Sequence, residues 1–373
     1  MKIIILGGSG NTGFLIAKYF LQSTDGSVIL AGRNSLKSGE CANKLNTEFE
    51  GSRVSSIKVD AADEESLIEA FSNADFVVSA GSTSQFTKNI ARAAIKCGID
   101  YIDVQYSALK LMQLNSIKDE IEKSGRCFIT DGGFHPGIPA AMIRYAAEKI
   151  DELHKANVGS LIKINWKGLN FGEDTALEMI EEFKTYDPLI YRNGEWINLE
   201  YKNRKSFNFG KRFGVQKETA MMLEEMRKLP EMIPTLKEAG FYVGGFNWFV
   251  DYFLMPVMFI YFKLFPKLSA MPMAKMFKWG LHTFSPPPYS TQLLLHAEGI
   301  KEGISANFEM KISHEDGYAL TAIPVVACIK QYLDGNKKPG LHLQANFVEP
   351  VGFFDDMKEM GVEIEEKYIG TAD

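Results

Sequence analysis

The stretch that decides the fold lies close to the amino terminus and reads Lys2-Ile3-Ile4-Ile5-Leu6-Gly7-Gly8-Ser9-Gly10-Asn11-Thr12-Gly13. Its first five residues form an apolar, β-branched run, which is typical of a buried parallel strand. The residues from Phe14 to Leu21 then have the apolar spacing of a helix. A strand, a glycine turn and a helix in this order predict a pyrophosphate site, because the backbone can approach the anion closely and helix amides face it.

The glycines of this turn satisfy two spacings. Gly8, Gly10 and Gly13 give G-x-G-x-x-G, whereas Gly7, Gly10 and Gly13 give G-x-x-G-x-x-G. The alternative is a βα turn of another doubly wound fold, which needs no ligand. We predict that the whole turn contacts a cofactor: Gly7, Gly8, Ser9, Gly10, Asn11, Thr12 and Gly13.

Length and composition narrow the function. The chain has 373 residues, which suits two domains, and a net charge of -6 without a basic block, which argues against a nucleic-acid partner. Four widely spaced cysteines and six histidines form no C-x-x-C or i, i+4 pair, so we expect no metal site. The cysteine usage and the short first apolar run, which is unlike a signal peptide, indicate a cytoplasmic protein.

Five further strands are expected in the first 140 residues, and they alternate with helices. The expected helices after the first cover residues 64–73, 86–97 and 109–124. This alternation predicts an α/β fold with a doubly wound parallel sheet of the Rossmann type, whose ligands lie at the carboxyl ends of the strands. The five strands cover residues 27–31, 54–60, 74–80, 100–104 and 126–130.

The end of the second strand indicates which dinucleotide is bound. Sites for NAD usually place a carboxylate there, whereas sites for NADP supply an arginine. This strand ends in Gly32-Arg33-Asn34, so we expect NADP, with Arg33 on the 2′-phosphate, and NAD remains the alternative. A solvated surface role for Arg33 and turn or capping roles for Asp60 and Ala61 are also open. The remaining expected cofactor contacts are Asn34, Asp60, Ala61, Ala80, Gly81, Ser82 and Gln105.

Two residues are candidates for proton transfer. His135 follows the sixth strand, near the expected nicotinamide end, and histidine exchanges protons near neutral pH. A helix-capping or packing role is the alternative for His135. Tyr106 forms a Y-x-x-x-K pattern with Lys110, as in short-chain dehydrogenases, although so short a motif also arises by chance. In that case Tyr106 could still line the crevice as a hydrogen-bond donor.

Several of these stretches together resemble the saccharopine dehydrogenase-like family of NADP-binding proteins. The resemblance implies a dinucleotide domain, a mixed-sheet α+β domain and a helix that returns to the first domain. It also implies oxidation or reduction of secondary amines through imines, on amino-acid-like substrates. True saccharopine reductases carry Asp-Pro-Gly where this chain has His135-Pro136-Gly137. The matching stretches are 7–13, 32–34, 59–63, 74–78, 94–103 and 132–137.

We therefore expect a Rossmann domain at residues 1–140, joined by a returning helix at about residues 319–335. A second α+β domain, for substrate binding and dimerisation, would cover residues 141–318 and 336–373. Within it, Asn193-Gly194 is a strong hairpin signal. The expected strands of its mixed or antiparallel sheet are 161–166, 190–192, 195–199, 291–296, 307–313 and 341–344.

An apolar segment at residues 246–279 stands out in the second half. Asp251, Pro256 and Lys263 interrupt it, which argues against a membrane-spanning helix. Three interpretations remain open. The segment packs in the core or at a homodimer interface, it lines an apolar substrate cavity, or it makes peripheral contact with a membrane surface.

The sequence thus favours an NADP-dependent oxidoreductase that moves a hydride to or from a C=N or C=O bond. The expected substrate is a small molecule, either amino-acid-like or apolar. The alternative is a non-catalytic dinucleotide-binding protein, associated with a membrane surface. A reductase similar to the short-chain dehydrogenases is less favoured, because the short Tyr106–Lys110 motif is all that supports it.

Overall fold

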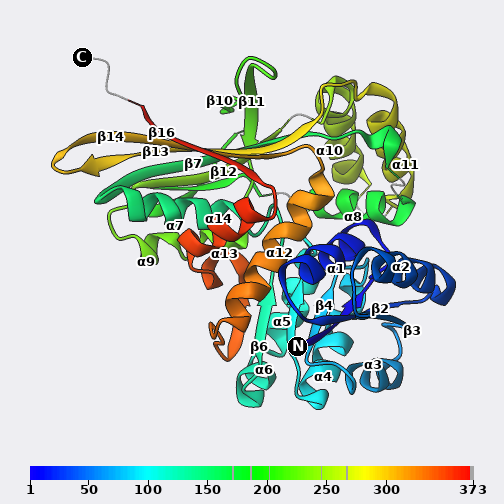
Figure 1. Cartoon of the computed structure of the whole chain (residues 1–373). Helices are drawn as coiled ribbons and strands as arrows, with labels where there is room; N and C mark the ends of the chain where they lie inside the picture. Colours follow the sequence, from blue (N-terminus) through cyan, green and yellow to red (C-terminus); the bar gives the residue numbers. More distant parts are fainter. Residues whose placement is uncertain (170–171, 185–186, 201, 245, 266–267, 370–373) are drawn as a thin grey trace. The chain divides into compact units, whose positions relative to one another are not determined.

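The computed structural model describes residues 1–373 except 170–171, 185–186, 201, 245, 266–267 and 370–373. The chain divides into two compact units, each with its own sheet (Figure 1). The first unit comprises residues 1–138 and 318–361. The second comprises residues 139–317 and 362–373.

The first unit confirms the predicted α/β fold. Its described residues form seven strands in the order β15-β6-β5-β4-β1-β2-β3, and every pairing is parallel. The strands are β1 (Lys2–Leu6), β2 (Ser27–Gly32), β3 (Val54–Lys58), β4 (Phe76–Ser79), β5 (Asp100–Asp103), β6 (Cys127–Thr130) and β15 (Gly340–Leu343). The helices are α1 (Asn11–Ser23), α2 (Ser35–Glu48), α3 (Glu64–Phe71), η1 (Ser84–Phe86), α4 (Thr87–Cys97), α5 (Ala108–Ser116), α6 (Lys118–Ser124), α12 (Gly317–Leu333), α13 (Gln344–Phe347) and α14 (Pro350–Glu359).

Two details of this unit differ from the sequence expectation. The stretch 341–344 was expected in the second sheet, but β15 pairs with β6 in the first, Leu341 opposite Phe128. The helix expected at 109–124 is two helices, since α5 ends at Ser116, α6 begins at Lys118, and the buried Ile117 lies between them. The first sheet is therefore one strand wider than its local sequence pattern indicates.

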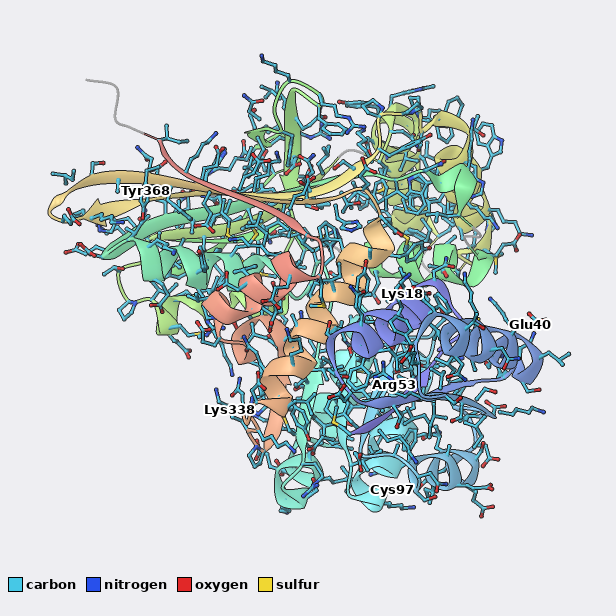
Figure 2. The ribbon with its side chains drawn as sticks, in the orientation of Figure 1. Lys18, Glu40, Arg53, Cys97, Lys338 and Tyr368 are labelled. Carbon is cyan, nitrogen blue, oxygen red and sulfur yellow. The ribbon has the colours of Figure 1, made fainter. Side chains whose placement is uncertain are left out.

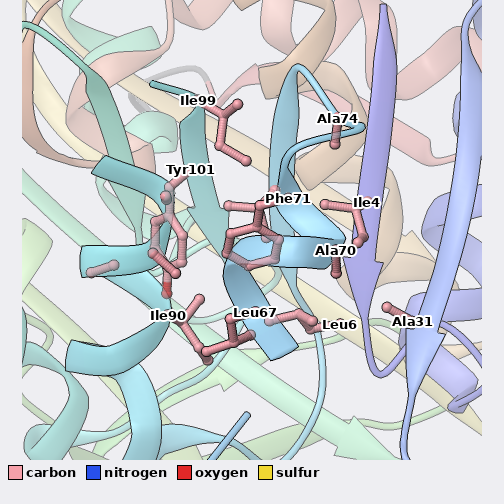
Figure 3. Packing of buried hydrophobic residues seen from close by; sticks show 14 of the residues in the cluster. Ile4, Leu6, Ala31, Leu67, Ala70, Phe71, Ala74, Ile90, Ile99 and Tyr101 are labelled. Carbon is pink, nitrogen blue, oxygen red and sulfur yellow. The ribbon is translucent and has the colours of Figure 1, made fainter. Parts of the chain in front are cut away.

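The core of the first unit explains why its strands read as continuous apolar runs. Ile4 on β1, Phe71 on α3 and Tyr101 on β5 are fully buried in one cluster between the sheet and its helices (Figure 3). Burying each such side chain contributes about 1.5–3 kcal/mol. Arg53, labelled in Figure 2, adds a polar anchor by donating hydrogen bonds to the carbonyls of Leu21 and Thr24 at the end of α1.

The second unit has a mixed sheet. Among the described residues, the path β10-β11-β12-β7-β13-β14-β16 and the attached strands β8 and β9 make nine strands, of which β12 and β7 pair in parallel. The strands are β7 (Glu152–Lys163), β8 (Leu189–Arg192), β9 (Glu195–Asn198), β10 (Lys205–Asn208), β11 (Val215–Ala220), β12 (Glu238–Gly244), β13 (Ser290–Lys301), β14 (Ile304–His314) and β16 (Glu363–Ile369). The helices are α7 (Pro139–Lys149), η2 (Trp166–Gly168), α8 (Glu173–Lys184), η3 (Glu224–Met226), α9 (Leu229–Met232), η4 (Val250–Leu254), α10 (Met255–Leu264) and α11 (Met271–Phe284).

The predicted hairpin of the second unit is present. Strands β8 and β9 pair antiparallel around Asn193 and Gly194, whose φ angles are 52° and 95°. Positive φ at both turn residues is what a two-residue hairpin loop requires, and Asn-Gly supplies it at little cost.

The described residues contain no helix that is both long enough and apolar enough to cross a membrane, and this holds for the described part of the apolar segment 246–279 as well.

Candidate functional site

The glycine turn between β1 and α1 forms a tight backbone cradle. The Gly10 amide donates to the Gly7 carbonyl at 2.9 Å, and the Gly7 amide donates to the Ala31 carbonyl at 2.8 Å. A Cβ atom on Gly7 would lie 2.6 Å from the Cα atom of Gly81, and one on Gly13 would lie 2.4 Å from the Gly7 carbonyl oxygen. Only glycine fits at both positions, so the cradle depends on the residues that the motif supplies.

The first turn of α1 is suited to an anion. Its N-cap residue is Gly10, which has no side chain, and no described side chain caps the helix or places a carboxylate in its first turn. The first amides of a helix lack partners within the helix and carry its partial positive charge. The turn Ser9–Thr12 therefore presents donors toward the place where the motif predicts a pyrophosphate.

The end of β4 forms the wall beside this cradle. The Ala80 amide donates to the Leu6 carbonyl at 2.9 Å, which fixes Gly81 against Gly7, and Ser82 is exposed in the same turn. The Gln105 side chain, just after β5, donates its Nε2 to the Gly81 carbonyl and also to Thr83 Oγ1 at 3.0 Å.

The side-chain oxygen of Gln105 favours the presence of a ligand. Gln105 Oε1 is buried and has no hydrogen-bond partner among the described residues. A buried amide oxygen without a donor costs about 1–3 kcal/mol. A donor from a bound molecule at the carboxyl end of β5 would satisfy it, so the glycine cradle and Gln105 both fit a dinucleotide.

Arg33 and Asn34 follow β2 at the same edge of the sheet, and the structure gives them different roles. Asn34 is the N-cap of α2, and its side chain accepts from the Lys37 amide at 3.0 Å. Arg33 is exposed and forms part of the turn before this helix. The guanidinium of Arg33 is therefore the group of this pair that is suited to a phosphate.

Asp60 and Ala61, where adenine binding was expected, form the turn that precedes α3. Asp60 Oδ1 accepts from the Ala62 amide at 3.0 Å, and Ala61 continues this turn toward Asp63, the N-cap of α3. Because Gly32 pairs with Lys58, this turn lies beside the end of β2. The arrangement accords with the alternative that the sequence left open for Asp60 and Ala61, and a role in adenine binding stays a prediction.

A buried ionic cluster lies between the ends of β5 and β6. Lys110 Nζ is 2.8 Å from Asp103 Oδ1 and 2.5 Å from Asp131 Oδ1, and it also donates to the Gln105 carbonyl at 2.5 Å. The Lys110 side chain is fully buried. Burial alone would lower the pKa of Lys110, but Asp103 and Asp131 outweigh burial and raise it. Lys110 therefore stays charged and holds the strand-end loops together.

This cluster changes the interpretation of the Tyr106 motif. In short-chain dehydrogenases the lysine acts on the tyrosine, whereas here the Lys110 ammonium is bonded to two carboxylates and a carbonyl inside the sheet edge. Tyr106 lies before α5 and is 41% exposed. These contacts of Lys110 favour the interpretation that the Y-x-x-x-K pattern arises by chance, and a catalytic role for Tyr106 stays a prediction.

His135 lies in the loop that follows β6. Burial lowers the pKa of His135 to about 4, so its imidazole is neutral near pH 7. Its ring centroid is 4.1 Å from that of Phe134. A neutral imidazole can accept a proton or donate its single N–H, whereas an imidazolium acid is excluded near neutral pH.

Sequence reasoning missed the residues that support this loop. Gln344 on α13 donates to the carbonyls of Gly133 and Gly137, at 3.5 and 3.3 Å. A Cβ atom on Gly132 would lie 2.6 Å from the Asp103 carbonyl oxygen, so the loop packs directly on the end of β5. The doubled glycine at 132–133 is a local signal that could have indicated this close packing, whereas no local pattern points to Gln344.

Comparison with known proteins agrees with this geometry. Residues 3–129 match the family described as the saccharopine dehydrogenase NADP binding domain. A carboxynorspermidine synthase of Vibrio alginolyticus is 23% identical over 272 residues, a match that covers 66% of this chain and 63% of that protein. This chain therefore spans less than two thirds of the curated relative.

The fold of the whole chain also has a solved counterpart. Apo saccharopine dehydrogenase (L-Glu forming) from Saccharomyces cerevisiae superposes with a TM-score of 0.66. The superposition covers 99% of this chain and 100% of that one, at 15% sequence identity. It shows the fold, while the resemblance inferred from the sequence motifs is confirmed by the match over residues 3–129.

Proposed function

We propose that the chain is an NADP-dependent oxidoreductase, because residues 3–129 match the saccharopine dehydrogenase NADP binding domain. The observation that carries the proposal is the glycine cradle, where a Cβ atom on Gly7 or Gly13 would overlap backbone atoms. The cofactor, when bound, supplies hydride chemistry at its nicotinamide ring.

The residues of this chain supply binding and orientation. The amides at Ser9–Thr12 would hold the pyrophosphate, Arg33 would bind the 2′-phosphate, and Gln105 would orient a donor at the carboxyl end of β5. The ionic cluster of Lys110 holds the Gln105 carbonyl and so fixes that loop. Positioning of this kind is a large part of what a protein contributes to a cofactor reaction.

The reaction class is hydride transfer to or from a C=N or C=O bond. Support comes from the relatives, which are a saccharopine dehydrogenase (L-Glu forming) and a carboxynorspermidine synthase. Hydride addition to an imine or a carbonyl needs a proton at the nitrogen or oxygen. In the oxidative direction, an amine N–H or alcohol O–H proton is released as the hydride leaves the adjacent carbon. We assign acceptance of this proton to the neutral imidazole of His135, which lies after the next strand beyond Gln105.

Titration with NADPH and NADH, followed by nicotinamide fluorescence, tests cofactor binding. We expect NADPH to bind more tightly than NADH. Gly13→Ala should abolish binding, because the new Cβ would meet the Gly7 carbonyl oxygen at 2.4 Å. Gly39→Ala is the matched control, since Gly39 is also helical and its Cβ would meet only Ser56 Oγ at 3.8 Å.

Two outcomes would contradict the proposal. Absence of binding by the wild-type chain to either dinucleotide would remove its basis. Binding without NADPH oxidation across a panel of imines and ketones would favour the alternative of a non-catalytic dinucleotide-binding protein.

A further inference from the structure

The outward side of helix α10 is apolar. Met258 is its buried residue, whereas Val257, Ile260 and Leu264 are exposed by 36%, 59% and 64%. A helix on the surface of a globular protein normally turns polar side chains to water. In α10 the arrangement is reversed, and Lys263 is the charged residue on its exposed side.

The exposed apolar side chains continue onto the neighbouring elements. Of the 21 large hydrophobic residues that are exposed in the described part of the chain, ten lie between residues 248 and 279. Soluble monomers rarely expose contiguous patches of this kind without a function. We call this set the apolar patch: Trp248, Tyr252, Phe253, Val257, Phe259, Ile260, Leu264, Phe265, Leu268 and Trp279.

At the base of the apolar patch, aromatic rings pack against one another. The ring of Phe284 at the end of α11 contacts Trp248, with centroids 4.9 Å apart, and Trp279, at 5.4 Å. Phe249 also contacts Trp279 at 5.3 Å. The two tryptophans are thus held in place while 60% and 53% of their surface stays exposed. Figure 1 shows α10 and α11 grouped beyond one end of the long strands of the second unit.

The charge of this region sets it apart from the rest of the chain. The sequence from 246 to 284 has four lysines, Lys263, Lys267, Lys275 and Lys278, against a single aspartate, although the whole chain has a net charge of -6. A cationic, aromatic, apolar surface complements an anionic lipid headgroup layer. Pairing of the patch with the same patch of a second copy would instead bring two sets of lysines together.

We propose that the apolar patch docks the protein onto an anionic membrane surface. Ile260, Leu264 and the two tryptophans enter the boundary between headgroups and acyl chains. Lys263, Lys275 and Lys278 contact the lipid phosphates. Tryptophan suits this depth, because its ring is apolar and its N–H remains in the polar layer. Docking is peripheral, since no described helix could span a bilayer.

Co-sedimentation with vesicles tests the proposal. One set of vesicles contains phosphatidylcholine alone, and the other contains equal amounts of phosphatidylcholine and phosphatidylglycerol. We expect the full chain to bind the anionic set, and Ile260→Glu with Leu264→Glu to weaken binding by about tenfold or more. Ile304→Glu is the matched control, because Ile304 is 70% exposed at the start of β14, outside the patch.

A second pair of variants tests the electrostatic part. The two single variants Lys263→Gln and Lys275→Gln should each weaken vesicle binding by about fivefold. Circular dichroism melts establish that each variant is folded. Failure of the wild-type chain to bind anionic vesicles, or equal binding by the Ile260→Glu, Leu264→Glu variant, would overturn the proposal. So would a dimer that this variant converts to a monomer without any vesicle binding, which would assign the patch to a second copy.

Discussion

Asp103 and Asp131 in the first unit and Glu218 in the second are carboxyl groups removed from water, yet their surroundings differ. Asp103 and Asp131 share the Lys110 ammonium, and Asp103 also accepts from Tyr101 at 3.0 Å. Glu218 on β11 is fully buried and accepts one hydrogen bond, from the Ser160 amide at 3.0 Å. Its other oxygen has no partner among the described residues.

The difference shows two ways of burying an acid. In the first unit both carboxylates contact the Lys110 ammonium, and this shared contact holds the loops at the candidate site. In the second unit, burial raises the pKa of Glu218 well above its ordinary value, and the Ser160 amide offsets only part of this. Burial therefore favours the protonated form of Glu218. A paired charge should be costly to disturb, whereas a protonated acid should tolerate a neutral isostere.

The largest expected effect comes from breaking the ionic cluster. Lys110→Met keeps the length of the side chain but leaves Asp103 and Asp131 without their cation. We expect the free energy of unfolding to fall by about 3–5 kcal/mol. Urea denaturation followed by circular dichroism measures it. Lys118→Met, at an exposed i, i+4 pair with Glu122, should change stability by less than about 0.5 kcal/mol. Equal losses of stability for Lys110→Met and Lys118→Met would mean that the buried cluster is no more costly to disturb than an exposed ion pair.

His135 provides a third case, a base that burial keeps neutral. Its pKa is about 4 in the folded chain against an ordinary value of 6.5, so the unfolded chain binds more protons between these values. Stability supplied by neutral His135 is present above pH 6.5 and is lost as pH falls toward 4, by up to about 3 kcal/mol. Urea denaturation at several pH values should show a smaller acid-dependent loss for His135→Gln than for the wild-type chain.

Much of the first unit could be predicted because its signals are local. The strand, the glycine turn and the helix at residues 2–21 are contiguous, and each strand of a parallel sheet buried on both faces appears as its own apolar run. The hairpin at Asn193-Gly194 was predictable for the same reason, since two adjacent residues set the turn. Such features need no knowledge of what lies elsewhere in the chain.

The parts that sequence reasoning missed depend on distant partners. β15 joins the first sheet beside β6, more than two hundred residues earlier in the chain, and its four residues carry no sign of that pairing. Lys110 seemed to belong with Tyr106 at i+4, but the fold brings Asp131 to it. Burial of Glu218 likewise depends on Gly159, where a Cβ would lie 2.6 Å from the Glu218 carboxylate. In each case topology decides the partner.

Arg33 extends the comparison of buried charges to an exposed one, because its guanidinium lies in water. Arg33→Ala should raise the Kd for NADPH by about tenfold, about 1.4 kcal/mol, and leave the Kd for NADH nearly unchanged. Nicotinamide fluorescence measures both constants, and added salt should narrow the gap, since exposed charges are screened. Lys37→Ala, exposed in the first turn of α2, is the control. A loss of the same size for NADH would show that Arg33 does not select the 2′-phosphate.

The smallest loss of stability is expected for a substitution of Glu218. The pH dependence of that loss tests whether Glu218 differs from Asp103 and Asp131. Glu218→Gln replaces a protonated acid by an amide of the same shape, so near pH 4 the free energy of unfolding should change by less than about 1 kcal/mol. Because the folded pKa is raised, the folded chain holds a proton that the unfolded chain releases above its ordinary pKa of 4.5. Wild-type stability therefore falls relative to the variant as pH rises from 4.5 toward neutrality. Urea denaturation of both proteins at several pH values measures this difference. A variant that instead loses stability against the wild type as pH rises would mean that Glu218 is ionised and paired, and the contrast with Asp103 and Asp131 would disappear.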